Sequence, residues 1–469
     1  MILFISIEFM TEFLYYSIRI KFFFQLPPVL LMPTFFNYAV LFLALGAAIA
    51  FLAPHVLYYR DLVSALSGSA AYYAAHVATL TDPDATFSAF GGNVVTSHVE
   101  VKRRQLTFSR DIAEGRVKRT NSLGIFRLAD SMFTFRPKIA LGMDDADHSV
   151  VRPWIDRVAW GAEQTWTTEE VERDVRELLA ARPAMSSVKV SISKIVLHVL
   201  HTRMLGRGAA HTWNDTEAFA AYQGQMLMHA VLPDALNSMS WAESVRTEQR
   251  RWLDLYAAGL TDDAPPGPTK EWKAWTWLTA LTFAGGLGTP TLIHNALAVL
   301  CNTKFELSPA TMDRFIMETS RLHPPVPEIM YDRRDAATGE YRPEVLVAGY
   351  AARDTSVWGE DAAEFKLRPL AEYHRNLAAF GEWTGMGEGY ATPDEAERPT
   401  NVDLRTQSRG CPGKHFTYVI ARTILTELAG TPARRRASCP SEAIAPQSPW
   451  GFADFALGGG ESGSGDDSK

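Results

Sequence analysis

Cysteine is scarce in this chain, which has only three cysteines among 469 residues. Cys301, Cys411 and Cys439 lie too far apart for a CxxC metal site. Their spacing also does not resemble a disulfide framework, which in small secreted domains uses an even number of closely spaced cysteines. The spacing therefore predicts free thiols, and a reducing compartment for the folded part of the chain.

A basic stripe is also absent. The chain has 46 Lys and Arg residues against 53 Asp and Glu residues, and the basic residues are dispersed. This argues against nucleic acid as a main partner. There is no internal repeat and no long polar linker before residue 430, so a single large catalytic unit is the simplest organisation. With 47% hydrophobic residues, such a unit can enclose a sizeable cofactor in its core.

The two ends of the chain differ in composition from this unit. Residues 22–59 contain no Asp, Glu, Lys or Arg, and the apolar run within them predicts a single-pass transmembrane anchor over residues 34–59. A cleaved signal peptide and a buried core helix remain open as alternatives. Residues 1–33 form an uncertain leader. Residues 431–469 are rich in Gly, Ser and Pro, and predict a flexible tail or an artefact of gene prediction.

Residues 60–430 predict a catalytic domain that is mainly α with a small β subdomain. Helical periodicity is strongest over residues 167–181, 215–228 and 241–258, and an apolar run at 272–300 predicts a further long helix. Short β-type runs follow Asp332, among them PEVLVAGY, and are broken by charged turns. They indicate a small sheet beside a helical body.

Cys411 lies in the segment Arg409-Gly410-Cys411-Pro412-Gly413, directly before the predicted helix FTYVIARTILTEL. A turn that leads into a helix N-terminus favours a thiolate, because the helix dipole and nearby cations lower the pKa of a cysteine. A thiolate is a strong donor to iron. The segment therefore predicts that Cys411 is a metal ligand, with a structural cysteine as the open alternative.

Glu318 and Arg321 form an ExxR pattern about ninety residues earlier, and His323-Pro324-Pro325 follows. An ExxR helix, an HPP segment and then a Cys-x-Gly turn resemble the cytochrome P450 superfamily. The resemblance implies a P450-type fold behind the anchor and a haem whose iron is bound by Cys411. It also implies that Arg409 and Gly413 help to bind the haem and that Glu318 and Arg321 form a buried structural ion pair. If the ExxR pattern is considered by itself, an ordinary ion pair on the surface remains the alternative.

Two further segments resemble family elements. His148 and Arg152 fall where the family places a helix whose side chains contact the haem propionates, and an arginine suits a carboxylate partner. The segment TFAGGLGTP resembles the distal helix, with Thr289 as the catalytic alcohol and Gly288 in place of the usual acid. A simple Gly-rich helix break at Pro290 is the alternative.

The loop before Cys411 departs from the common family pattern. Leu404 and Gln407 occupy positions where the family usually has Phe and Gly. Together with FAGG in the distal segment and a long insertion before the cysteine, these departures resemble allene oxide synthases and hydroperoxide lyases. Those enzymes rearrange fatty-acid hydroperoxides and need no reductase.

The resemblance therefore implies a haem-thiolate monooxygenase that oxidises a lipophilic small molecule with O2 and electrons from an NADPH-dependent reductase. Secondary metabolism is the expected context. The anchor implies the endoplasmic reticulum membrane, with the catalytic domain in the cytosol. Two alternatives stay open: a fatty-acid hydroperoxide isomerase or lyase, and a non-catalytic membrane-anchored protein with a haem fold.

Overall fold

The computed structural model describes the greater part of the chain between residues 87 and 457. The described residues are 87–89, 92–118, 145–160, 162–231, 240–303, 305–327, 329–377, 411–431, 434, 439–448 and 451–457. All of them belong to one compact unit, Asp61–Lys469. The predicted leader (1–33) and the predicted anchor (34–59) lie outside the described residues.

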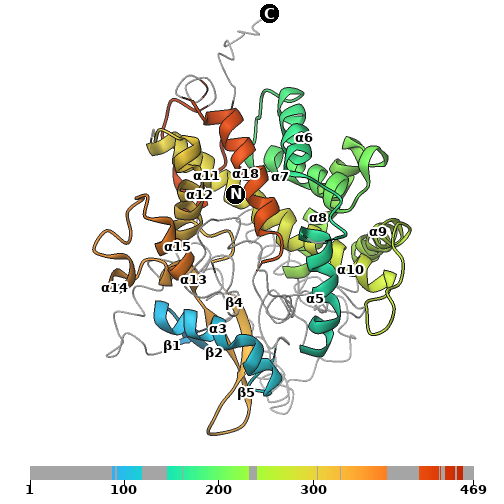
Figure 1. Cartoon of the computed structure of the whole chain (residues 1–469), viewed down its shortest axis with the longest axis vertical. Helices are drawn as coiled ribbons and strands as arrows, with labels where there is room; N and C mark the ends of the chain where they lie inside the picture. Colours follow the sequence, from blue (N-terminus) through green and yellow to red (C-terminus); the bar gives the residue numbers. More distant parts are fainter. Residues whose placement is uncertain are drawn as a thin grey trace, which may run out of the picture. The chain divides into compact units, whose positions relative to one another are not determined.

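Helices dominate the described chain, and a small sheet accompanies them, as the sequence predicts (Figure 1). The helices are α3 (His98–Ala113), α5 (Asp145–Trp160), α6 (Thr168–Ala180), α7 (Val188–Val199), η2 (Leu200–Met204), η3 (Gly208–Ala210), α8 (Trp213–Val231), α9 (Ser240–Ala257), α10 (Lys270–Thr279), η5 (Ala280–Gly288), α11 (Thr289–Thr303), α12 (Pro309–Leu322), α13 (Ala348–Ala351), α14 (Thr355–Trp358), α15 (Leu370–Asn376) and α18 (Lys414–Ala429). The strands are β1 (Phe87–Ala89), β2 (Gly92–Val95), β3 (Val117–Lys118), β4 (Ile329–Arg334), β5 (Tyr341–Leu346), β6 (Pro446–Ser448) and β7 (Gly451–Phe452).

Helix α6 illustrates how local sequence determines these elements. The Thr167 side chain accepts a hydrogen bond from the backbone N–H of Glu170, and the Glu170 carboxylate accepts one from the backbone N–H of Thr167. This capping box satisfies two N–H groups that the first helical turn leaves without partners. Val171, Val175 and Leu179 recur every fourth residue and are buried, so one face of the helix packs into the core. The helix predicted here is confirmed.

The long apolar run predicted as one helix forms three consecutive helical segments, α10, η5 and α11. The central segment, Ala280–Gly288, is a π-helix, whose hydrogen bonds span five residues instead of four. Pro290 follows it and has no backbone N–H to donate to the preceding turn. The predicted break is therefore a change of helical pitch, and the helix continues through it.

The five-stranded sheet has the order β1-β2-β5-β4-β3. Strands β2 and β5 are parallel, and the other neighbouring strands are antiparallel. Its buried apolar side chains pack together with those of α3, including Val95, Val101 and Leu346. The predicted extended run PEVLVAGY is strand only to Leu346, because α13 begins at Ala348. In Figure 1 the labelled strands β1, β2, β4 and β5 of this sheet lie around α3, apart from α6, α7, α11 and α18.

The main core lies among the helices. Helix α11 contacts α7, α12 and α18, and α18 also contacts α6. Large aromatic side chains fill this core, and Trp154, Trp252 and Trp275 are almost completely buried. The rings of Trp154 and Trp277 meet edge to face at 5.3 Å and join α5 to α10. The helices that carry the candidate site are therefore fixed by one continuous apolar core.

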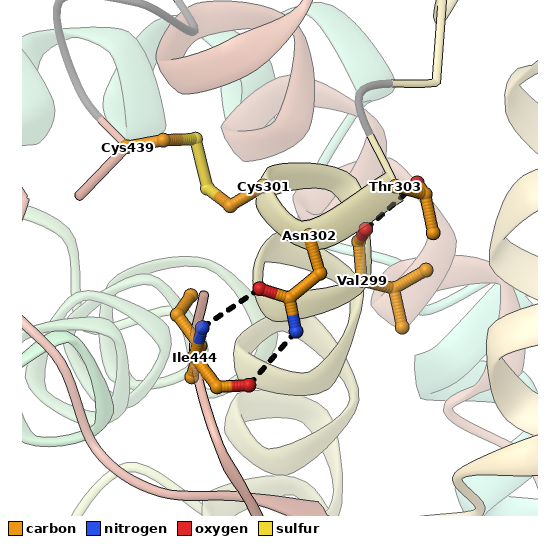
Figure 2. The surroundings of a disulfide bond; sticks show 6 residues. All are labelled: Val299, Cys301, Asn302, Thr303, Cys439 and Ile444. Carbon is orange, nitrogen blue, oxygen red and sulfur yellow. Dashed lines mark hydrogen bonds between the residues drawn. A yellow bond between two sulfur atoms is a disulfide. The ribbon is translucent and has the colours of Figure 1, made fainter. Parts of the chain in front are cut away.

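Residues 439–448 and 451–457, which we call the C-terminal clamp, are attached to the helical body. Cys439 forms a disulfide with Cys301 in α11, 138 residues earlier in the chain. The Asn302 side chain donates to the carbonyl oxygen of Ile444 and accepts from its backbone N–H, both at 2.8 Å (Figure 2). Farther along, Leu457 pairs with Met185 through two backbone hydrogen bonds.

The clamp corrects two expectations. The composition of residues 431–469 predicts a flexible tail, but the clamp residues are ordered by contacts with α7 and α11, which no local pattern signals. The cysteine spacing predicts free thiols, yet Cys301 and Cys439 are bonded. Two cysteines that are 138 positions apart leave no short-range spacing pattern in the sequence. The expectation of a reducing compartment depended on free thiols, so the disulfide removes its basis.

Candidate active site

Cys411 lies at the start of α18, two residues before the N-cap Gly413 leads into the helix. Its thiol is free, and the residue is half-buried. The backbone N–H groups of Gly413 and Lys414 donate toward its sulfur. Trp166 packs against the first turn of α18, where its ring lies 5.6 Å from that of His415. The turn therefore holds a thiol in a fixed position against a helix N-terminus.

Opposing effects act on the pKa of the Cys411 thiol. Burial raises the pKa of the Cys411 thiol, because a buried anion loses its hydration. The two backbone N–H groups and the cations of Arg152 and Lys414 act in the opposite direction and lower this pKa. The backbone N–H groups at the helix terminus therefore favour the thiolate, as the sequence predicts, while burial opposes it.

His148 and Arg152 lie one turn apart on α5, and both are buried. The Arg152 Nε donates to Asp156 Oδ1 at 2.9 Å, one turn farther along the helix. Arg152 is also close enough to Cys411 for its charge to act on the thiol. Two predicted residues that are about 260 positions apart in the sequence thus belong to one site, and Asp156 is a partner that the sequence did not reveal.

Glu318 and Arg321 form a buried ion pair on α12, and neither side chain is exposed. Two parallel hydrogen bonds join them: Arg321 Nε donates to Glu318 Oε2 at 2.8 Å and Arg321 Nη2 donates to Oε1 at 2.7 Å. The remaining Arg321 N–H groups donate to three backbone carbonyl oxygens, those of Ala352, Ala362 and Glu364. All five donors of the guanidinium are satisfied, as a buried arginine requires.

The carboxylate of Glu318 is equally well satisfied. Its Oε1 accepts a hydrogen bond from the backbone N–H of Lys366 at 3.0 Å, and its Oε2 accepts one from the Tyr373 hydroxyl at 2.9 Å. The indole of Trp358 lies under the guanidinium of Arg321, 4.9 Å from the ring centroid. The neighbouring Arg368 forms an ion pair with Asp361. The pair therefore ties α12 to residues 352–373, and Tyr373 has a role that sequence reasoning missed.

The glycines of the distal segment make room for protein groups. A Cβ at Gly286 would lie 1.6 Å from the carbonyl oxygen of Leu281 and 2.8 Å from Gln223 Nε2, and a Cβ at Gly285 would lie 3.1 Å from Leu200 Cδ1. At Gly288 a Cβ would meet nothing within 4 Å. Gly286 is therefore needed by the π turn itself, whereas position 288 has space for a side chain.

Thr289 begins α11 directly after the π segment and is buried. Its hydroxyl lies 2.8 Å from the Thr417 hydroxyl on α18, and either oxygen can be the donor. Thr417 is a partner that the sequence did not indicate. This hydrogen bond joins the predicted distal helix to the helix that begins at Cys411, so the two halves of the site are linked through side chains.

Some predicted features lie outside the described residues. They are Arg409, Leu404, Gln407 and the insertion before Cys411. Among the residues that the structure does describe, no helix is both long and apolar enough to cross a membrane. The same residues contain no group of three or more His, Cys, Asp or Glu side chains that could hold a metal ion on their own.

The fold resembles many solved structures. The hydroxylase HmtN matches with a TM-score of 0.56 and 14% identity, over 83% of this chain and 96% of that one. P450BioI, solved with acyl carrier protein ligated to hexadec-9Z-enoic acid, matches with a TM-score of 0.56 and 15% identity, over 83% and 97%. The cytochrome P450 enzyme CYP109B1 from Bacillus subtilis matches with a TM-score of 0.52 and 14% identity, over 78% and 93%.

The chain has the cytochrome P450 fold. At these identities the likeness concerns the fold, and the chemistry has to be argued from the residues. No protein-family model matches the sequence, and no curated protein matches it either.

The P450 fold implies a haem held by a cysteine thiolate, and the residues present fit that group. The sulfur of Cys411 is free and in reach of two backbone N–H groups, which stabilise a coordinated thiolate. Binding to a metal deprotonates a thiol outright, so the raised pKa of Cys411 is no obstacle. Arg152 supplies a buried cation in the same neighbourhood, which suits the carboxylates of a haem.

Proposed function

We propose that the protein is a haem-thiolate monooxygenase that oxidises a lipophilic small molecule. The observation that carries the proposal is the free Cys411 thiol at the N-terminus of α18, with Arg152 of α5 beside it in a P450 fold. When bound, haem supplies the iron centre for cleavage of an O–O bond and transfer of oxygen. The protein supplies the ligand, the counter-charges and the protons.

The proximal residues have distinct roles in this proposal. Cys411 would bind the haem iron, and Gly413 keeps the turn beside its sulfur free of a side chain. His148 and Arg152 would hold the haem propionates, and Arg409 would also help to bind the haem. Glu318 and Arg321 bind neither haem nor substrate. They fix α12 against residues 352–373, and so keep the haem-binding half of the fold in register.

On the distal side, Thr289 is the proposed catalytic alcohol. Its hydrogen bond with Thr417 fixes the position of the hydroxyl before any substrate arrives. The hydroxyl can accept a proton from a water molecule and pass its own proton toward the reacting oxygen. Because Gly288 offers no acid, the proton must come through water.

The proposed partners follow from the same chemistry. Electrons come from an NADPH-dependent reductase, and the substrate is lipophilic, in keeping with the fatty-acyl ligand in the P450BioI complex. We further propose a membrane attachment through residues 34–59 at the endoplasmic reticulum, and a role in secondary metabolism. The Cys301–Cys439 disulfide is unusual for a cytosolic domain.

A second candidate function is a fatty-acid hydroperoxide isomerase or lyase. The observation that favours it is the pairing of the Thr289 hydroxyl with Thr417 beside a residue 288 that carries no acid. An enzyme that cleaves an O–O bond already present in its substrate needs no proton delivery to O2 and no reductase. The same Cys411 thiolate would serve both reactions.

The first experiment tests the haem thiolate. We expect the purified protein, reduced and exposed to carbon monoxide, to show the red-shifted Soret band that a thiolate ligand produces. Cys411→Ser should abolish this band, while Cys301→Ser should keep it. Absence of the band from the wild type, with haem supplied, would overturn the proposal and favour a non-catalytic protein.

The second experiment separates the two enzymes. The haem-loaded protein is mixed with a fatty-acid hydroperoxide in the absence of NADPH and reductase. A monooxygenase consumes the hydroperoxide slowly, whereas rapid turnover would establish the isomerase or lyase activity in its place.

A further inference from the structure

The π segment η5 is held from outside by a buried glutamine. Gln223 of α8 donates its side-chain amide to the carbonyl oxygen of Thr282 at 2.7 Å, and its Nε2 lies 3.5 Å from the carbonyl oxygen of Leu281. Only 4% of the Gln223 residue is exposed. An amide buried against main-chain oxygens has a specific partner, because water cannot replace it.

The same contact depends on Gly286. A Cβ on this residue would approach Gln223 Nε2 to 2.8 Å and overlap with the carbonyl oxygen of Leu281. The missing side chain therefore allows the wide π turn and the approach of the amide at one place. On the neighbouring side, Gly285 allows Leu200 of η2 to pack close to the segment. Two adjacent glycines thus bring two other elements onto η5.

Such contacts matter because a π-helix is intrinsically less stable than an α-helix. A π segment persists where interactions from outside favour it, and these segments recur at functional sites. If η5 relaxed to α-helical pitch, the helix after it would rotate about the helix axis relative to the helix before it. The rotation would be about 100° for each extra residue that the π turn now accommodates. Thr289 stands at the C-terminal boundary of η5, so its orientation depends on that pitch.

We infer that Gln223 is a positioning residue that holds η5 in π-helical pitch and thereby sets the orientation of Thr289. This inference rests on the proposed function only for the role of Thr289. Gln223 lies on α8, which packs against α7 and α9. A displacement of α8 would lengthen the hydrogen bond from Gln223 to Thr282, so the position of this helix is communicated to the catalytic alcohol.

The first test is amide hydrogen exchange on the full-length protein. Gln223→Met keeps the length of the side chain and removes its donors. We expect exchange of the amides in residues 281–288 to accelerate about tenfold, which corresponds to about 1.4 kcal/mol. Exchange in α18 should not change. Gln225→Met, an exposed position on the same helix, is the matched control and should leave η5 unaffected.

The second test separates positioning from simple support of the fold. Thr417→Val removes the partner of the Thr289 hydroxyl, and its effect on urea unfolding is measured in the wild type and in the Gln223→Met variant. Gln223 and Thr417 lie on different helices, so their effects should add unless η5 couples them. We expect the effect of Thr417→Val on the unfolding constant to fall at least threefold in the Gln223→Met background.

A second variant of Gln223 keeps the inference testable. If Gln223→Met does not fold, Gln223→Asn provides the same test, since its amide stays polar but is one methylene too short to reach Thr282. Unchanged exchange in η5, or strictly additive effects with Thr417→Val, would overturn the inference. Neither measurement needs haem. A wild type without the thiolate Soret band would therefore reject the proposed function and leave the result on Gln223 standing.

Discussion

At the scale of single residues, Arg321 has a complete set of partners. Its five N–H groups donate to Glu318 and to three backbone carbonyl oxygens, without contact with solvent. A surface pair with the same i,i+3 spacing exists between Glu100 and Arg103, where the arginine side chain is 55% exposed. The Glu318–Arg321 and Glu100–Arg103 pairs thus share one spacing and differ in burial.

We expect Arg321→Lys to lower the free energy of unfolding by more than about 2 kcal/mol, because an ammonium cannot satisfy a carboxylate and three carbonyl oxygens at once. Arg103→Lys should change it by less than about 0.5 kcal/mol, since the pair is exposed to solvent. Urea unfolding of both variants provides the measurement. Equal effects would show that burial of the Glu318–Arg321 pair does not determine its contribution.

Two glycines in the distal segment should respond in opposite ways to alanine. Gly286→Ala places a Cβ onto the carbonyl oxygen of Leu281, so we expect a loss of about 1–3 kcal/mol in unfolding free energy. Gly288→Ala meets no atom within 4 Å and should stabilise the helix by roughly 0.5–1 kcal/mol. Thermal or urea unfolding distinguishes the two, and a stabilising Gly286→Ala would contradict the π-helical geometry of η5.

At the scale of elements, the C-terminal clamp contacts α7, α11 and the segment that follows α12. Its disulfide closes a loop that contains α12, Cys411 and α18. Its Phe452 ring packs 4.8 Å from the ring of His323, directly after α12. Its Asp454 carboxylate accepts hydrogen bonds from Ser187 and from the backbone N–H of Lys189 at the start of α7. The clamp therefore joins the segment after α12 to α7 and α11.

We expect the double variant Cys301→Ser, Cys439→Ser to unfold with about 2–4 kcal/mol less free energy than the wild type, because the open chain gains conformational freedom. Urea unfolding without reductant measures the difference. Titration of the denatured, unreduced wild type should detect one free thiol, that of Cys411. Three free thiols would show that the bond between α11 and the clamp does not form.

At the scale of the whole molecule, several buried or half-buried histidines make stability depend on pH. Burial lowers the pKa of each of them, to about 4 for His211 and about 3 for His323. The group comprises His98, His198, His201, His211, His294 and His323. Three of them form a cluster in which the rings of His201 and His211 stack at 4.2 Å, and His198 and His211 both bond to Thr216.

The direction of the pH effect follows from these shifts. In the folded protein these histidines bind protons only at a lower pH than in the unfolded chain, where they bind them near the ordinary pKa of 6.5. The free energy of unfolding should therefore fall as the pH drops below 6.5, and continue to fall toward the lowered pKa values. At about pH 5.5 each histidine that stays neutral should cost about 1.4 kcal/mol.

Urea unfolding at about pH 7.5 and about pH 5.5 measures this loss. The variant His211→Asn should show a smaller loss, because one fewer side chain must stay neutral in the folded state. A stability that does not change over this interval would mean that the histidines are not held neutral by burial.

The sequence by itself determined the features that depend on neighbouring residues. Periodicity indicated α6, α8, α9 and α18, because helix formation is governed by contacts three and four residues apart. Ordered short motifs indicated the P450 fold and pointed to Cys411, Glu318 and Arg321. These motifs can be recognised in the sequence because each one occupies a single turn or loop.

Only the tertiary structure decided the features that join distant segments. The Cys301–Cys439 bond, the Tyr373 hydroxyl on Glu318, and Gln223 on η5 connect residues separated by 138, 55 and 59 positions. No local spacing predicts such contacts, since they depend on how whole helices pack. The raised pKa of Cys411 has the same origin: the turn favours a thiolate, but the burial that opposes it is a property of the complete fold.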